Sequence, residues 1–154
     1  MTSLKEQIQH DLTQAMRDKD AITTSTLRMV ITAITNEEVA GKEVRTLSEQ
    51  DLITVLTREA KKRREASTAY AEANRPELAS KEDDELAVIE RYLPTALTDD
   101  EIAQIIASAV QQVTDAGQTG PSSMGAVMKI VQPQTAGRAD GGKIAGLVKQ
   151  ALTN

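Results

Sequence analysis

The sequence predicts an all-α fold, and three observations support this prediction. Apolar residues recur three and four positions apart through almost the whole chain, which is the spacing of a helix with one buried face. No segment keeps the alternation of apolar and polar residues that is typical of a half-buried strand. The chain has 154 residues, of which 40% are hydrophobic, so it can bury a core rather than stay disordered.

Two helices are predicted at the start of the chain. An apolar stripe begins at Leu4, and Ser3 with Glu6 has the spacing of a capping box, which satisfies free backbone donors at a helix start. A second stripe predicts a helix from residue 21 to about residue 39. The charged stretch at residues 18–20 weakens the first helix, so the second is either separate or a bent continuation of it.

A long antiparallel helical hairpin is predicted next. Ser48 and Asp51 have the spacing of another capping box and mark the start of a helix over residues 49–73. Pro76 is suited to the first position of a helix and starts a second one that runs to Leu93. The short turn between the two helices lets them lie side by side.

Pro94 marks a predicted domain boundary, because a proline restricts the residue before it to extended backbone. Residues 1–94 form a helical N-terminal domain, and residues 95–154 form a small three-helix C-terminal domain. In this second domain a helix starts after Thr98 and a short one ends before Pro133. The last helix follows a glycine-rich turn.

Composition excludes several kinds of chemistry. The chain has no Cys and one histidine, His10, which removes disulfides, thiolate metal sites and Cys nucleophiles and leaves little for a catalytic triad or a His-based metal cage. We therefore expect no cofactor, no metal site and no catalytic residue. The net charge of −5 means that any binding to nucleic acid or anionic lipid has to be local.

Nothing in the sequence predicts a membrane anchor. The longest apolar runs, such as Met29 to Ile31, are far shorter than the roughly 18 residues of a membrane span. The N-terminus lacks the apolar stretch of a signal peptide. A cytoplasmic location is therefore expected.

The strongest charge feature is the run from Lys61 to Arg64. Four consecutive helical residues point nearly all round the helix axis, so part of this helix must face water. The run could contact phosphates of a nucleic acid, or it could form ion pairs inside the hairpin with the acidic residues 82–85; we favour the ion pairs. The acidic run itself is interpreted as a solvated face rather than a Mg²⁺ site, because consecutive helical residues do not converge on one point.

The turn at residues 137–142 has two interpretations. Its glycines permit unusual backbone angles, and Asp140 can cap the last helix. Alternatively, Arg138 and the backbone amides at the helix start could hold a phosphate. Both roles could coexist.

Several segments together closely resemble the YqeY family. They fall in the same order along nearly the whole chain: Thr26-Leu27-Arg28-Met29, Lys62-Arg63-Arg64-Glu65, Tyr70, Tyr92-Leu93-Pro94, Met124-Gly125, Val127-Met128-Lys129 and Gly137-Arg138-Ala139-Asp140-Gly141. The family is similar to the tail region of GatB, a component of the glutamine-dependent tRNA amidotransferase. The resemblance implies a helical N-terminal part, a three-helix tail domain and a link to tRNA.

Three functions are considered, the first two of which follow from this resemblance. The first is a non-catalytic helical module that binds tRNA, other structured RNA or the amidotransferase subunits. The second is a component of glutamine-dependent amide transfer with carbon-nitrogen ligase activity, and the third is a protein-protein adaptor. With two Tyr and no Trp or Phe, the chain would read the shape and phosphates of RNA rather than stack its bases. The residues expected to contact RNA are Lys129, Arg138, Lys143 and Lys149, and after them Lys61, Lys62, Arg63 and Arg64.

Overall fold

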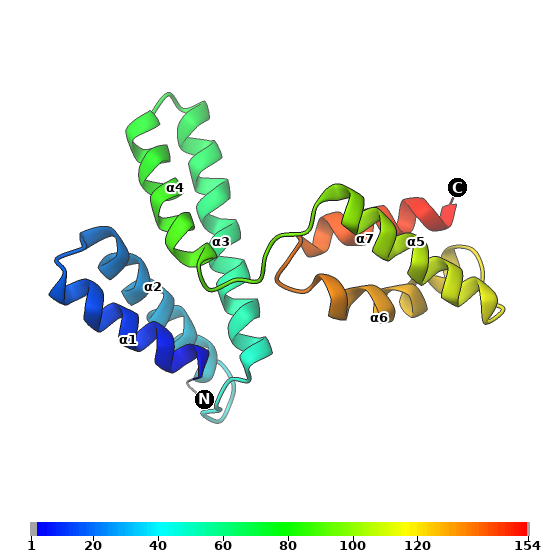
Figure 1. Cartoon of the computed structure of the whole chain (residues 1–154), viewed down its shortest axis with the longest axis horizontal. Helices are drawn as coiled ribbons and strands as arrows, with labels where there is room; N and C mark the ends of the chain where they lie inside the picture. The colour runs from blue at the N-terminus through cyan, green and yellow to red at the C-terminus, as the bar shows by residue number, and fades with distance from the viewer. Residues whose placement is uncertain (1–2, 154) are drawn as a thin grey trace. The chain divides into compact units, whose positions relative to one another are not determined.

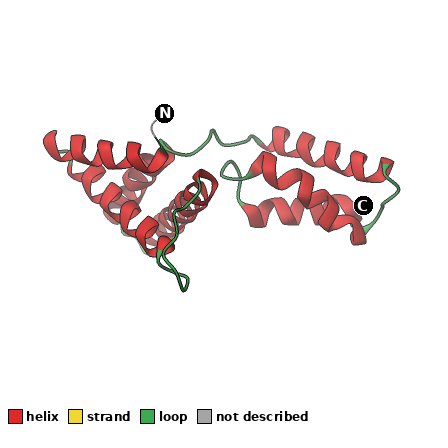
Figure 2. Ribbon diagram, turned by 90° about the horizontal axis from the view of Figure 1, so that it is seen from below, coloured by secondary structure: helices red, strands yellow, loops and turns green. Residues whose placement is uncertain are grey.

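The computed structural model describes residues 3–153 and shows seven α-helices and no strand within that range (Figures 1 and 2). The all-α prediction is therefore confirmed. The helices are α1 (Leu4–Arg17), α2 (Ala21–Glu38), α3 (Glu49–Glu72), α4 (Pro76–Glu90), α5 (Asp99–Asp115), α6 (Met124–Thr135) and α7 (Gly141–Thr153). A single turn of 3₁₀ helix, η1 (Pro121–Ser123), precedes α6.

The chain divides into two compact units, one that ends at Leu93 and one that begins at Pro94. Helices α1 to α4 build the first, called here the N-terminal unit, and α5 to α7 build the second, the tail unit. Each unit has its own cluster of buried aliphatic side chains. In the part of the chain that the structure describes, no helix combines the length and the apolar character needed to cross a bilayer.

Helices α1 and α2 are separate and pack side by side, so the bent continuous helix is not formed (Figure 1). Lys19 between them has a φ of 57°, in the left-handed region that helps to reverse the chain. Asp20 then caps α2: its carboxylate accepts hydrogen bonds from the Thr23 amide at 3.1 Å and the Thr23 hydroxyl at 2.7 Å. The charged stretch thus forms a turn and a cap.

The Asp20 cap should make the N-terminal unit sensitive to acid. The Thr23 hydroxyl and amide hold the pKa of the Asp20 carboxyl below its ordinary value of 3.8. A carboxyl with a lowered folded-state pKa contributes stability above its ordinary pKa, and this is lost as the pH falls through the folded-state pKa. Asp20→Ala should therefore lower the urea midpoint at pH 7, and its gap to the unmodified protein should narrow below about pH 4.

The control for this cap is Asp84→Ala, which removes an exposed carboxylate from the middle of α4. It makes the same change of charge without removing a cap, so its urea midpoint should differ less from that of the unmodified protein. If the urea midpoints of Asp20→Ala and the unmodified protein differed by the same amount at pH 7 and pH 3, the prediction would be contradicted.

Helices α3 and α4 lie side by side and run in opposite directions (Figure 1). The predicted capping box at the start of α3 is confirmed: Ser48 Oγ accepts from the Asp51 amide, and the Asp51 carboxylate accepts from the Ser48 amide, both at 3.1 Å. Leu47 and Leu52 on either side of the cap are buried, as in a hydrophobic staple. Helix α4 ends at Glu90 rather than at the predicted Leu93.

A hydrogen bond ties the end of the N-terminal unit to its first helix. The Tyr92 hydroxyl donates to the Asp11 carboxylate at 2.6 Å, although the two residues are 81 positions apart. Burial, with the Asp11 carboxylate beside it, raises the pKa of Tyr92. The hydroxyl therefore stays protonated at neutral pH and keeps its proton for this bond.

The three helices of the tail unit enclose its core. The core residues are Ile102, Ile106, Ala109, Val113, Val127, Val131, Ile144 and Val148. The predicted start of α5 is confirmed, because Thr98 Oγ1 accepts a hydrogen bond from the Glu101 amide at 3.1 Å. This cap fixes where the polypeptide enters the tail core.

Helix α6 continues through Pro133 to Thr135, so the prediction that this helix ends before Pro133 is wrong. Pro133 is exposed, and its missing N–H lies on the water-facing side, where a helix tolerates the loss best. Side chains support the last turn: Gln134 donates to the Ile130 carbonyl at 3.0 Å and Thr135 to the Val131 carbonyl at 3.1 Å.

Candidate nucleic-acid interface

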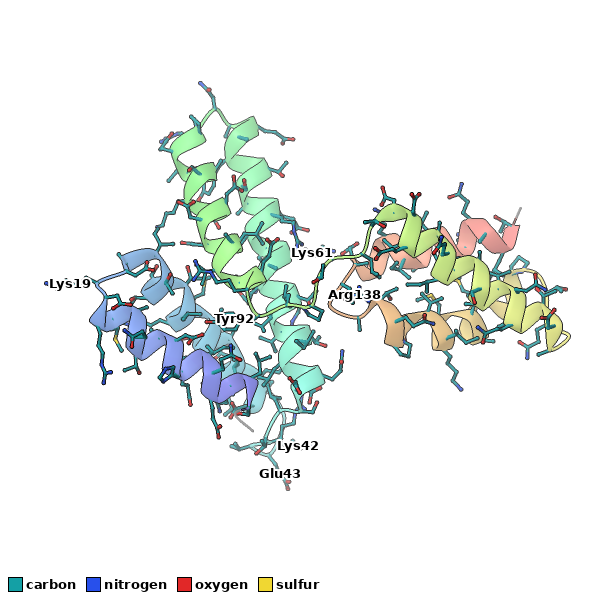
Figure 3. The ribbon with its side chains drawn as sticks, in the orientation of Figure 1. Lys19, Lys42, Glu43, Lys61, Tyr92 and Arg138 are labelled. Atoms are coloured by element: carbon teal, nitrogen blue, oxygen red, sulfur yellow. The ribbon has the colours of Figure 1, made fainter. Side chains whose placement is uncertain are left out.

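Two of the predicted tail cations contact the segment that leads into α5. Arg138, in the loop between α6 and α7 (Figure 3), donates from Nε to the Thr95 carbonyl at 2.9 Å. Lys143 Nζ, in the first turn of α7, lies 2.7 Å from Asp99 Oδ1. A backbone hydrogen bond joins the same two segments, since the Leu97 amide donates to the Arg138 carbonyl at 2.9 Å. Both cations therefore fasten the start of α5 to the rest of the tail unit.

The contact between Lys143 and Asp99 leaves Lys143 accessible. The two side chains are 51% and 84% exposed, and water screens an ion pair of this kind so that it adds little stability. The hydrogen bond from Lys143 holds the pKa of Asp99 below its ordinary range, so the Asp99 carboxyl is ionised at neutral pH. A phosphate that approaches Lys143 competes with one exposed carboxylate and not with a buried partner.

Lys129 on α6 and Lys149 on α7 are exposed, and neither forms an ion pair with a residue that the structure describes. Lys143 and Lys149 are six positions apart on α7, about 240° round the helix axis. The structure therefore does not gather the four tail cations on one helix face. Instead it distributes them over α6, the following loop and α7.

The turn before α7 acts as a cap. Asp140 Oδ2 accepts a hydrogen bond from the Lys143 amide at 3.0 Å, and the Asp140 carbonyl accepts one from the Ile144 amide at 3.0 Å. Gly137 has a φ of 73°, in the left-handed region that glycine adopts without strain. The capping role predicted for Asp140 is confirmed, and its carboxylate uses an amide that a phosphate at this helix start would need.

The basic run on α3 has an inward-facing member. Arg63 Nη1 lies 3.1 Å from Glu82 and 3.3 Å from Glu85, both on α4, and the three side chains are only 20%, 13% and 11% exposed. The favoured interpretation, ion pairing inside the hairpin, is confirmed for Arg63. The interpretation of residues 82–85 as a solvated face is wrong for Glu82 and Glu85, because Arg63 holds their carboxylates between the two helices.

The neighbours of Arg63 in the basic run are more exposed. Lys62 lies 3.2 Å from Glu59, and Arg64 lies 3.7 Å from Glu90, with 61% of the Lys62 and 53% of the Arg64 side chain exposed. Lys61 is also exposed on α3 (Figure 3). The outer part of the run can therefore meet a phosphate, whereas Arg63 serves the packing of α3 against α4.

No metal centre is formed by the residues that the structure describes: no three or more His, Cys, Asp or Glu side chains lie close enough to hold an ion. His10 is exposed on α1, as its position on the helix predicts.

The structure has a groove between α5 and α7 that the sequence did not predict. It has a volume of about 660 Å³, and Ala103 and Ala107 of α5 face Leu147 and Ala151 of α7 across it. The two alanines are four positions apart and both exposed, which is the signal that could have indicated a second apolar face on α5. The larger aliphatic side chains on the buried face of α5 give a stronger periodic pattern, and the weaker pattern of the two alanines was not recognised beside it.

The sequence matches the family described as Yqey-like protein over residues 5–152. It is also similar to "Altered inheritance of mitochondria protein 41, mitochondrial" from Kluyveromyces lactis, with 30% identity over 115 residues, 75% of this chain and 61% of the relative. The protein of the same name from Meyerozyma guilliermondii is 37% identical over 89 residues, 56% of this chain and 44% of the relative.

The chain thus spans about half the length of the curated relatives that it matches. The family match, in contrast, extends from α1 to α7 and includes both units. The segments that resemble the YqeY family all lie within it. The chain therefore belongs to the family of Yqey-like proteins.

Proposed function

We propose that the protein is a non-catalytic module that binds structured RNA of the tRNA type, mainly through its tail unit. The observation that carries the proposal is the pair of exposed lysines without ion-pair partners in the described chain, Lys129 and Lys149. Lys143 and Arg138 add two cations from the same unit. The resemblance of the family to the GatB tail supports tRNA as the RNA and the amidotransferase subunits as further partners.

The contacts in this proposal are made to phosphates. Lysine ammonium groups bind phosphate as point charges, and without Trp or Phe the chain has little surface for base stacking. Because the net charge is −5, binding should be weak at physiological salt and much stronger at low salt. From the basic run on α3, only Lys61, Lys62 and Arg64 contribute, since Arg63 is occupied by Glu82 and Glu85.

The test is a fluorescence anisotropy titration of labelled bulk tRNA with the full chain at several salt concentrations. The double variant Lys129→Ala/Lys149→Ala should weaken binding several-fold at low salt. The slope of log K against log salt should become shallower by about 0.7–0.9 for each phosphate that the variant no longer neutralises. Both lysines are exposed, so the fold should be unaffected.

The matched control is Lys42→Ala/Lys81→Ala, which removes two exposed lysines from the N-terminal unit (Lys42 is labelled in Figure 3). It changes the net charge equally and should leave affinity close to that of the unmodified chain. Equal losses in the two double variants, or no binding at low salt, would contradict the proposal. Glutamine- and ATP-dependent amidation of mischarged tRNA by the purified chain would contradict its non-catalytic part.

The proposal includes a cytoplasmic location for this chain. The names of the curated relatives describe those proteins as mitochondrial. Fluorescence microscopy of a tagged chain in its own cells tests the location, and confinement to an organelle would contradict it.

A further inference from the structure

A polar pocket of the tail unit lies on the side of α5 that faces away from the apolar groove. Its volume is about 310 Å³, at the lower end of the range of about 300–1,000 Å³ for small-ligand pockets. Four residues at helical spacing line it from α5: Glu101, Gln104, Ile105 and Ser108. Leu97, Gln134 and Arg138 line it from the segment before α5, the end of α6 and the loop before α7. The pocket therefore suits one small, mostly polar group.

The Glu101 carboxylate lacks the partner that its position in the helix would normally give it. Glu101 is the third residue of α5, and at this position Glu6 in α1 and Asp51 in α3 accept a hydrogen bond from the capping residue's amide. In α5 only the other half of the capping box is formed, the bond from the Glu101 amide to Thr98. Within residues 3–153 the carboxylate forms no hydrogen bond or ion pair, so it is available to a ligand that donates hydrogen bonds.

Arg138 is held in place and still has donors to spare. Its Nε donates to the Thr95 carbonyl at 2.9 Å, and its own carbonyl accepts from the Leu97 amide at 2.9 Å. The N–H groups on its two Nη atoms have no partner in the part of the chain that the structure describes. Glu101 and Arg138 thus line one pocket with opposite charges and do not pair with each other. A ligand between them has to donate to the carboxylate and accept from the guanidinium.

The guanine base has this pattern of donors and acceptors. Its N1–H and N2–H groups are neighbours and can donate to the two oxygens of one carboxylate, while O6 and N7 accept from an arginine fork. Adenine and cytosine carry an acceptor beside their amino group, and uracil has a carbonyl on each side of its N–H, so none of them offers a carboxylate two adjacent donors. Leu97 and Ile105 supply apolar contact for the plane of a base, and the amides of Gln104 and Gln134 offer further hydrogen bonds.

We propose that this pocket binds one unpaired guanine base of the RNA, with Glu101 accepting from N1 and N2 and Arg138 donating to O6 and N7. The base has to be unpaired, because a guanine in a duplex uses N1, N2 and O6 for its own base pair. The inference rests on the proposed function and adds one base contact to its phosphate contacts. It gives the module a preference among RNAs, which contacts from lysine to phosphate cannot provide.

The probe is a fluorescein-labelled hairpin RNA whose loop carries a single guanosine among uridines. A second hairpin has inosine at this place, which lacks the N2 amino group, and a third has adenosine. In anisotropy titrations of the full chain at one low salt concentration, the guanosine hairpin should bind at least about fivefold more tightly than either of the others. All three RNAs carry the same phosphates, so the ratio of affinities reports the base contact alone.

Two variants of adjacent α5 residues locate the contact. Glu101→Gln keeps the shape of the side chain but offers one acceptor oxygen in place of two, and it should reduce the preference for guanosine over inosine to less than about twofold. The helix start is retained, because Thr98 bonds the Glu101 amide and not its side chain. Asp100→Asn is the matched control: it makes the same change of charge on an exposed residue that does not line the pocket. It should keep the full preference for guanosine.

Several results would overturn the inference. Equal binding of the three hairpins, or a preference that Glu101→Gln retains, would do so while the proposed function stands. Free GMP that displaces the labelled hairpin as well as unlabelled guanosine hairpin does would make a mononucleotide the ligand in place of RNA. Displacement by excess glycine would assign the two charges to a zwitterionic amino acid. Failure of all three hairpins and of tRNA to bind would contradict the proposed function itself, and this inference with it.

Discussion

Arg63→Met should destabilise the N-terminal unit by about 3 kcal/mol, the cost of leaving a buried charge without its partner. The substitution keeps most of the side-chain volume and removes only the guanidinium. Glu82 and Glu85, which are 13% and 11% exposed, would then lie side by side on α4, against α3, without the guanidinium that pairs with both. Two carboxylates in so little water repel each other strongly.

The measurement is urea unfolding at pH 7, followed by circular dichroism. Arg64→Met is the matched control: its partner Glu90 is 3.7 Å away and both side chains are about half exposed, so the change in unfolding free energy should stay within about 0.5 kcal/mol. Adding Glu82→Gln and Glu85→Gln to Arg63→Met should recover much of the loss. Equal effects of Arg63→Met and Arg64→Met would contradict the prediction.

This cluster also affects how RNA binding is tested. Even with Arg63 in place, its Nε atom is buried without a hydrogen-bond partner in the described part of the protein, so a further unsatisfied polar group in the hairpin would be costly. An Arg63 variant that fails to bind tRNA would report unfolding rather than the removal of a phosphate-binding side chain. Lys61, Lys62 and Arg64 are the appropriate members of the basic run for such experiments.

The second large effect is expected in the tail unit, where Ile144→Ala should unfold α5 to α7. Ile144 is 1% exposed in the centre of the tail core, and truncating a buried isoleucine to alanine costs about 2–5 kcal/mol. A unit of this size has a total stability of only about 3–9 kcal/mol, at 0.05–0.15 kcal/mol per residue. The expected loss is therefore comparable with the whole free energy of unfolding of the tail unit.

The readout is the number of unfolding transitions. The N-terminal unit has a separate core, so its transition should stay in place while the tail transition moves to lower urea or disappears. Gly146→Ala is the control on the same helix: a Cβ at Gly146 would meet no atom within 4 Å, and replacing a helical glycine should stabilise the tail by about 0.5–1 kcal/mol. A single transition that moves as a whole would contradict the predicted division into two domains.

The helix starts could be predicted because a cap is a local structure. Ser48 and Asp51 are three residues apart, as are Thr98 and Glu101, and the bonds that define these caps lie inside that window. Pro133 shows the limit of local reasoning. Its neighbours favour a helix end, but the buried Val131 and Thr135 hold the last turn of α6 in the tail core, and tertiary packing overrides the local preference.

The cations of the candidate interface could be found from the sequence, but their surroundings could be found only in part. The predicted hairpin placed the basic run beside residues 82–85, which is confirmed for Arg63, whereas the partner of Lys143, Asp99, is 44 positions away on another helix. Such pairs depend on how helices meet, which periodicity does not encode. The division of the basic run into one inward and several outward side chains therefore needed the structure.

The bond between Tyr92 and Asp11 has a consequence for folding during synthesis. Chains grow at about 5–20 residues per second, so the ribosome needs about 4–16 s to travel the 81 positions from Asp11 to Tyr92. In that interval α1 and α2 can pair with each other, but α1 lacks its bond to the end of the unit. The first helix made thus receives its final tie only when the unit is complete, and nascent chains that stop before Tyr92 should expose it to proteases more than the complete unit does.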